Sequence, residues 1–289
     1  MPNPLVKGTK KIVLTFFSEL FAALEIAAPI LFYSVGFIAV LVTAVSKSGF
    51  GGAVALGIPM LLLVTSPRIA LAVTLPILLI IDVWVVFFSN KKIDYKLLII
   101  MLIFGLLGHF FGWYFFDYIS NTALVMFISL MSLITVFSYF RKRFFPVKLD
   151  IVSNLPFQKR PLALWSWGGF WCTLSGIASF ISVSGGIPLQ IFLMSCKLPR
   201  HTFIGSAGAF FFILNLTKVP LYWDLGILSK STGLLSLSLL PAIPLGITLG
   251  QKINNKISDD QFYLLLHIIL GIVGLQLLYS VIVQYAINL

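Results

Sequence analysis

Two serine- and glycine-rich stretches interrupt apolar sequence, one in each half of the chain, and both have the composition of an anion-binding site. The first stretch contains Ser46, Lys47, Ser48, Gly49, Gly51 and Gly52, and the second contains Ser182, Ser184, Gly185 and Gly186. Backbone N–H groups at the start of a helix bind anions, and glycine lets the ligand approach them closely. Lys47 can add a positive charge, and the serine hydroxyl groups can donate hydrogen bonds. Both stretches therefore favour binding of a small oxyanion.

Asp82, Asn215 and Lys218 are further polar residues inside apolar sequence. A lone carboxylate in such a run is a functional candidate, and Asp82 can either carry a coupling proton or pair with a lysine and hold the fold. Asn215 and Lys218 lie one helical turn apart, where they can bind the substrate or form a polar helix end near the membrane surface. Lys47 has a similar alternative, because a lysine side chain can extend to the cytoplasmic interface.

The other polar residues favour neither catalysis nor metal binding. His109 and His267 have no partner at metal-ligand spacing, and Cys172 and Cys196 match no metal or disulfide spacing. No nucleophile and base, no phosphate-binding loop after a strand and no zinc motif can be recognised. An intramembrane enzyme would have to use Asp82 and the isolated histidines. We therefore expect a protein that is not an enzyme and that needs no metal and no cofactor.

The composition indicates a membrane protein. Of the 289 residues, 59% are hydrophobic and 10% are charged, and the mean hydropathy is +1.05. An ordinary soluble domain has about 25% charged residues, so a water-soluble fold of this size could not bury so much apolar surface. The net charge of +11 does not point to nucleic acid, because the lysines and arginines lie in short loops. The expected partners are the lipid bilayer, a small anionic substrate and a coupling ion such as a proton.

Ten apolar segments follow one another, five in each half. They cover residues 29–45, 53–64, 69–88, 97–116, 121–139, 162–182, 187–196, 202–221, 232–250 and 261–285. The segments at 53–64 and 187–196 are shorter than the ~20 residues that cross a bilayer. They therefore complete broken helices or re-enter the membrane from one side. A chain of 8–10 transmembrane segments results.

Matching motifs indicate that the second half repeats the first. Pro67-Arg68 corresponds to Pro199-Arg200, and the glycine pair at 108 and 112 corresponds to the pair at 246 and 250. Five crossings per half would invert the second repeat relative to the first. The sequence thus predicts an all-α polytopic membrane protein with two inverted repeats. Its predicted parts are an N-terminal tail or interfacial helix (1–28), the first repeat (29–140), a basic loop (141–161) and the second repeat (162–289).

The basic residues predict the orientation in the plasma (inner) membrane. With the loop 141–161 in the cytoplasm, most of the other basic loops fall on the same side, as the positive-inside rule expects. The lysines at positions 7, 10 and 11 fit less well, because ten crossings place the N-terminal tail on the opposite side. Eight crossings with two re-entrant hairpins are the alternative count.

Taken together, these motifs resemble the TauE/SafE family of sulfite-exporter-like membrane permeases over residues 30–285. In the first half, the similar residues are Lys47-x-Gly49-Phe50-Gly51-Gly52, Pro59, Leu75-Pro76 with Asp82, and Lys91-Lys92-x-Asp94-Tyr95. In the second half, they are Ser184-Gly185-Gly186-Ile187-Pro188-Leu189-Gln190, Leu198-Pro199-Arg200 and residues 212–222 (FILNLTKVPLY). The chain departs from the common pattern in having two glycines, not three, at the second break.

This resemblance implies secondary transport of small anions, typically sulfite, sulfonates and related organosulfur compounds. We expect the two broken helices to meet near the bilayer midplane and the two halves to rock around the bound anion. The alternatives are a permease for another small solute, an intramembrane enzyme or a membrane scaffold.

Overall fold

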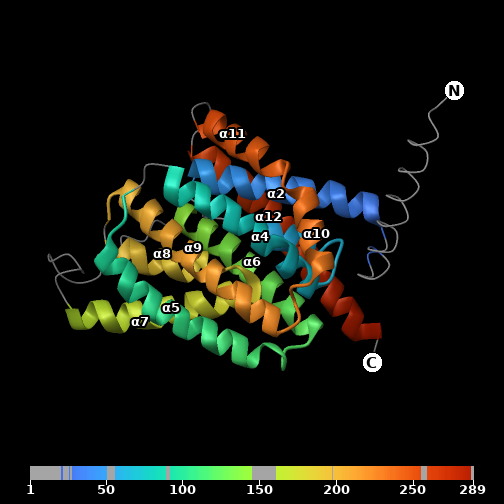
Figure 1. Cartoon of the computed structure of the whole chain (residues 1–289), viewed down its shortest axis with the longest axis horizontal. Helices are drawn as coiled ribbons and strands as arrows, with labels where there is room; N and C mark the ends of the chain where they lie inside the picture. The colour runs from blue at the N-terminus through green and yellow to red at the C-terminus, as the bar shows by residue number, and fades with distance from the viewer. Residues whose placement is uncertain are drawn as a thin grey trace.

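The computed structural model describes residues 21, 26, 28–50, 56–88, 92–144, 161–196, 198–254 and 259–287. In these ranges the chain forms helices and connecting turns and has no β-strand. Figure 1 shows the helices packed beside one another as one bundle. The predicted all-α class is confirmed.

The helices reproduce the order of the predicted apolar segments. The first half contains α2 (Pro29–Phe50), α3 (Gly57–Leu61), α4 (Pro67–Val83), a π-helical turn η1 (Trp84–Phe88), α5 (Tyr95–Phe116) and α6 (Asn121–Phe144). The second half contains α7 (Pro161–Ser182), α8 (Gly186–Ser195), α9 (Arg200–Asp224), α10 (Lys230–Leu239), α11 (Ala242–Asn254) and α12 (Asp259–Ile287).

Local sequence signals explain where several helices begin. Pro67 occupies the first turn of α4, where its missing N–H has no intrahelical partner to lose. Asp94 precedes α5 and accepts a hydrogen bond from the N–H of Leu97 at 3.1 Å. Ser229 and Thr232 form a reciprocal capping box at the start of α10.

Two details differ from the sequence prediction. The first break does not begin at Ser46, because α2 continues to Phe50. Serine, lysine and a single glycine lower helix propensity by only about 1 kcal/mol per residue at most, so they do not end a packed helix. Conversely, the segment 232–250 is not continuous: α10 and α11 are bent by 41° around Leu240 and Pro241. Pro241 lacks the N–H that would continue the helix.

The structure supports a multi-pass membrane protein by helix length and composition. Among the described residues, six helical stretches are long and apolar enough to cross a membrane, and the bent pair α10 and α11 makes a seventh when counted as one span. Helix α7, with 22 residues, is as long as these stretches, but its Trp, Ser and Gly residues lower its mean hydropathy. At 1.5 Å per residue, α3 and α8 extend only about 8 and 15 Å, far less than the roughly 30 Å hydrocarbon core.

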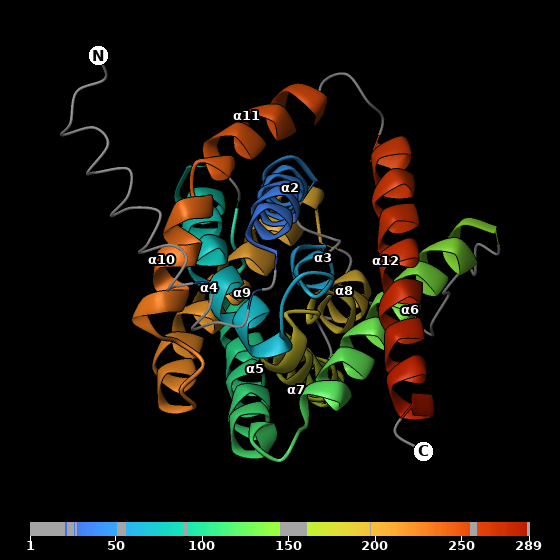
Figure 2. The same cartoon turned by 90° about the vertical axis from the view of Figure 1, so that its right-hand side faces the viewer.

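Helix contacts between the halves come in matched pairs. Helix α5 packs on α7, and α11 packs on α2; likewise α5 contacts α9, and α10 contacts α4. Helices α4 and α9 contact each other, as do α6 and α12. Figure 2 shows α11 over α2 and α12 beside α6. This pairing agrees with the predicted repetition of one five-segment unit.

The two predicted glycine pairs lie at matched interfaces. A Cβ atom at Gly108 of α5 would meet the carbonyl oxygen of Thr173 on α7. A Cβ atom at Gly246 of α11 would lie 2.7 Å from the carbonyl oxygen of Leu41 on α2. Each glycine therefore lets two backbones approach closely, as expected for small residues at membrane helix interfaces.

Candidate functional site

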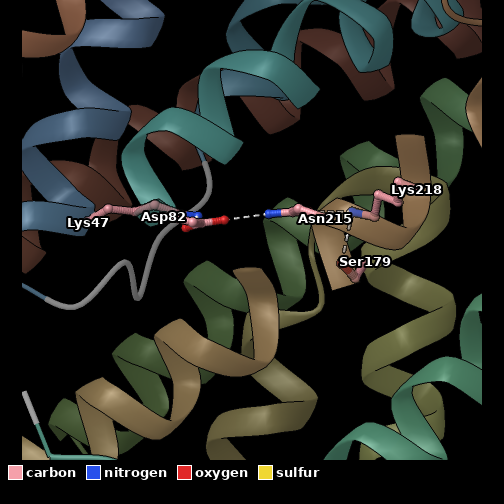
Figure 3. A network of polar contacts seen from close by, with 5 residues as sticks. All are labelled: Lys47, Asp82, Ser179, Asn215 and Lys218. Atoms are coloured by element: carbon pink, nitrogen blue, oxygen red, sulfur yellow. Dashed lines mark hydrogen bonds and ion pairs between the residues drawn. The ribbon is translucent and has the colours of Figure 1, made fainter. Parts of the chain in front are cut away.

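Four helices contribute polar side chains to one continuous network at the centre of the protein. Lys47 of α2 forms an ion pair with Asp82 Oδ1 of α4. The amide of Asn215 on α9 donates to Asp82 Oδ2 at 2.7 Å, and its carbonyl oxygen accepts from Lys218 Nζ at 3.0 Å. Lys218 Nζ also donates to Ser179 Oγ of α7 at 3.0 Å. Figure 3 shows Lys47, Asp82, Asn215 and Lys218 following one another, with Ser179 to one side of Asn215 and Lys218.

The network is buried and carries more positive than negative charge. Asp82, Asn215, Lys218 and Ser179 are at most 2% exposed, whereas the side chain of Lys47 is 18% exposed. Two ammonium groups and one carboxylate give a surplus of one positive charge (2 − 1 = 1) when all three are ionised. A buried charge without a counter-ion is costly, so a surplus ammonium group here would need an anionic partner or would lose its proton.

Within the described part of the chain, Lys218 Nζ donates two hydrogen bonds, one to Asn215 Oδ1 and one to Ser179 Oγ. An ammonium group has three N–H donors. Lys218 therefore has one N–H left to donate to a further acceptor.

The second predicted break is present, between α7 and α8. Val183 has a φ of +57°, a left-handed conformation that is rare for a β-branched residue. The N–H groups of Val183 and Ser184 bond to the carbonyls of Ser179 and Ala178 at 3.0 and 3.2 Å. This turn ends α7 and directs the chain into the ten-residue α8.

The serine hydroxyl groups at this break already donate to the backbone. Ser182 Oγ donates to Ala178 O at 2.9 Å, and Ser184 Oγ donates to Ser182 O at 3.2 Å. Their predicted donation to an anion would require these bonds to open. The glycines differ: a Cβ at Gly185 would meet the carbonyl oxygen of Ser175, whereas a Cβ at Gly186 would enter open space.

The start of α8 lies beside the lysine of the network. A Cβ at Gly185 would be 2.8 Å from Ser179 Cβ, and Ser179 holds Lys218 Nζ. The first N–H groups of a helix have no intrahelical acceptor and carry the positive end of its dipole. Lys218 and the N-terminus of α8 thus present positive charge to neighbouring space.

The first predicted stretch is described only in part. Ser46 is buried, and Ser48 Oγ has no hydrogen-bond partner among the described residues. Gly49 lies in the last turn of α2, so its N–H is not at the start of a helix, contrary to the prediction. Gly51 and Gly52 fall outside the described residues.

Aromatic residues that follow Ser179 and Lys218 in the chain pack on one another. Phe180 and Tyr222 are fully buried, with ring centroids 5.1 Å apart, and Tyr222 Oη donates to the carbonyl oxygen of Phe180 at 2.5 Å. Phe116 at the end of α5 packs on Phe180 at 6.0 Å. The Arg68 guanidinium lies over the Phe116 ring at 5.3 Å. Arg68 also pairs with exposed Asp117 at 3.1 Å.

Sequence reasoning did not identify Ser179 as part of the site. A signal was present, because Ser175, Ser179 and Ser182 follow the i, i+4, i+7 spacing of one helical face leading into the break. His109, which has no partner at metal-ligand spacing in the sequence, contacts Thr217 Oγ1 at 3.2 Å. His267 stacks on Tyr139, with ring centroids 4.0 Å apart.

Comparisons with known proteins identify the family. No curated protein and no solved structure matches the chain. The family model described as sulfite exporter TauE/SafE matches residues 34–277, which include every member of the polar network. The chain therefore belongs to the sulfite exporter TauE/SafE family of membrane transporters.

Proposed function

We propose that this protein is a secondary transporter of small anions, with sulfite- or sulfonate-type organosulfur compounds as its substrates. The observation that carries the proposal is the surplus positive charge of the buried network formed by Lys47, Asp82, Asn215, Lys218 and Ser179. A scaffold protein gains nothing from such a network, whereas a transporter needs a charged site that its substrate can neutralise.

The anion binds next to Lys218 and the start of α8. The space beside Gly186 is open, and the preceding Gly185 packs against Ser179, which accepts from Lys218 Nζ. An oxyanion in this position accepts one hydrogen bond from the ammonium group and others from the first N–H groups of α8. Gly186 is suited to this position because it places no side chain between the ligand and the backbone.

Asp82 balances charge in the empty site. Its two carboxylate oxygens are used by Lys47 and Asn215, which holds it in place as the counter-ion of Lys47. This pairing favours a charge-balancing role over the proton-carrying role that the sequence also allowed. Lys47 can join the substrate site when the anion replaces Asp82 as its partner.

Transport follows from movement of the two halves around the bound anion. Lys47 and Asp82 belong to the first half, and Asn215, Lys218 and Ser179 belong to the second, so the hydrogen bond between Asp82 and Asn215 joins the halves. Rocking of one half against the other opens the site first to one side and then to the other. We place the protein in the plasma (inner) membrane with the loop 141–161 in the cytoplasm.

Thermal unfolding of the purified protein in detergent tests the proposal. A ligand that binds only the folded state raises the unfolding midpoint by mass action. Sulfite, sulfate, thiosulfate, sulfoacetate, taurine and lactate form the panel, and chloride at equal ionic strength is the control. We expect a sulfur oxyanion to raise the midpoint of the parent protein and to leave that of Lys218→Met unchanged. Equal midpoints with the whole panel and with chloride would contradict the proposal.

A further inference from the structure

His109 is a buried histidine that the proposed anion site does not use. It lies on α5 with 1% of its surface exposed, and its ring packs edge to face on Phe180 at a centroid distance of 5.4 Å. Its Nδ1 atom is 3.2 Å from Thr217 Oγ1 on α9. Its Nε2 atom is buried and has no hydrogen-bond partner among the described residues.

The hydrogen bonds of Thr217 determine which ring nitrogen carries the proton. Thr217 Oγ1 donates its one hydrogen to the carbonyl oxygen of Leu214 at 2.8 Å. While Thr217 donates there, the same oxygen accepts from His109, and Nδ1 is the N–H donor. In the neutral ring Nε2 is then an acceptor with a lone pair, and this lone pair is the unpartnered group. A buried acceptor without a donor is costly, and a proton can bind there.

Two chain neighbours connect His109 to the anion site. The His109 ring contacts Phe180, which directly follows Ser179. His109 Nδ1 contacts Thr217 Oγ1, and Thr217 directly precedes Lys218. Burial removes the imidazole from water, and the field of the Lys218 ammonium acts on it as well. The protonation of His109 and the occupancy of the anion site are therefore electrostatically linked.

The surrounding titratable groups leave Lys218 as the charge that matters most. Helix α7 has no acidic or basic residue, and its titratable side chain is Cys172. Helix α9 contributes Arg200 and His201 at its start, and Tyr222 and Asp224 besides Lys218; Asp224 binds the Trp113 indole at 2.9 Å on an exposed surface. Helix α4 contributes Asp82, which pairs with Lys47, and Arg68, which pairs with Asp117 beyond the end of α5. On α5 itself, Tyr95 and Lys96 lie at its start and Tyr114 is exposed.

We propose that Nε2 of His109 binds the proton that is transported together with the anion. This inference rests on the proposed function. Binding of one H⁺ to the Nε2 lone pair gives an imidazolium, and its loss on the other side of the membrane restores the neutral ring. Protonated His109 then carries one positive charge, and Lys47, Asp82 and Lys218 together carry one more. These two surplus charges match a dianion such as sulfate or sulfoacetate.

The same charges disfavour binding of the proton when no anion is bound. Without the anion, an imidazolium and the Lys218 ammonium would share a buried site, so the proton is disfavoured. With the anion bound, the proton is favoured. Because coupling is reciprocal, the proton strengthens binding of the anion by the same factor as the anion strengthens binding of the proton.

Calorimetric titration of the purified protein measures this coupling directly. Sulfate and sulfoacetate are added above pH 6, where their charges are constant, in two buffers with different ionisation enthalpies. The difference in heat gives the protons taken up per anion bound. We expect about one proton per anion for the parent near pH 7, and we expect His109→Gln to bind an anion without proton uptake. Glutamine does not titrate but can donate to Thr217.

A second variant distinguishes His109 from Asp82, the other candidate for carrying the proton. In Lys47→Met/Asp82→Asn both charges of the ion pair are removed together, and proton uptake should remain. The inference is overturned if the parent binds the anion without proton uptake, if His109→Gln takes up as many protons as the parent, or if only the double variant loses uptake. Failure of the parent to bind either anion would overturn the proposed function as well.

Discussion

Asp82 and Asn215 meet where α4 contacts α9, and they occupy nearly equivalent positions in the two halves. Asp82 lies 15 residues after Pro67 (82 − 67 = 15), and Asn215 lies 16 residues after Pro199 (215 − 199 = 16). Their side chains bond at 2.7 Å. The centre of the network is therefore a contact between the two repeats, with a carboxylate on one side and an amide on the other.

Asp82→Asn should destabilise the empty protein more than Lys47→Met/Asp82→Asn. The single change leaves the Lys47 and Lys218 ammonium groups without a carboxylate, and breaking a buried ion pair costs about 3–5 kcal/mol. The double change removes both charges of the pair. Thermal unfolding in detergent without added anion compares the two variants. A single variant as stable as the double one would show that the pair does not balance the buried charge.

Lys218→Met should weaken anion binding about 10- to 100-fold, since a hydrogen bond to a charged group contributes about 1.5–3 kcal/mol. Lys252→Met is the matched control, because Lys252 is exposed in the last turn of α11 and lies outside the network. Titration with the anion that stabilises the parent most gives the dissociation constants. Similar dissociation constants for the two variants would show that Lys218 does not bind the anion.

Gly186→Ala and Gly185→Ala should separate binding from folding. A Cβ at Gly186 enters open space, so that variant should fold normally but bind the anion more weakly. A Cβ at Gly185 collides with the carbonyl oxygen of Ser175, so that variant should be less stable. Size-exclusion profiles and unfolding midpoints report folding, and titration reports binding. Unchanged anion binding by Gly186→Ala would argue against a ligand at the start of α8.

Gly108→Leu and Gly246→Leu should both disrupt the helix packing. Each added side chain collides with a neighbouring backbone, and overpacking of this kind costs about 1–3 kcal/mol or more. Gly233→Leu on α10 is the control, because a Cβ there meets nothing within 4 Å. The yield of folded protein after detergent extraction provides the measurement. Normal yields for the first two variants would contradict the close contacts of α5 with α7 and of α11 with α2.

The sequence predicted the helical segments because membrane helices need long apolar runs, and these are visible without tertiary information. It predicted the interfaces at Gly108 and Gly246 less directly, through a spacing that repeats in both halves. The end of α2 at Phe50 was missed, because packing extends a helix past residues of modest helix propensity.

The network itself could be predicted only as separate residues. Lys47, Asp82, Asn215 and Lys218 were recognised because each is polar within an apolar run. Their pairing depends on contacts between residues that are far apart in the chain, such as Asp82 and Asn215. Ser179 was missed, since serine is common in membrane helices and its role depends on the lysine it faces.

One end of the network is accessible to solvent and the other end is buried. At Lys47, 18% of the side chain is exposed, whereas Lys218 is completely buried. In the transport cycle proposed above, these two ends would exchange, so that the hydrated lysine becomes enclosed as the enclosed one becomes hydrated.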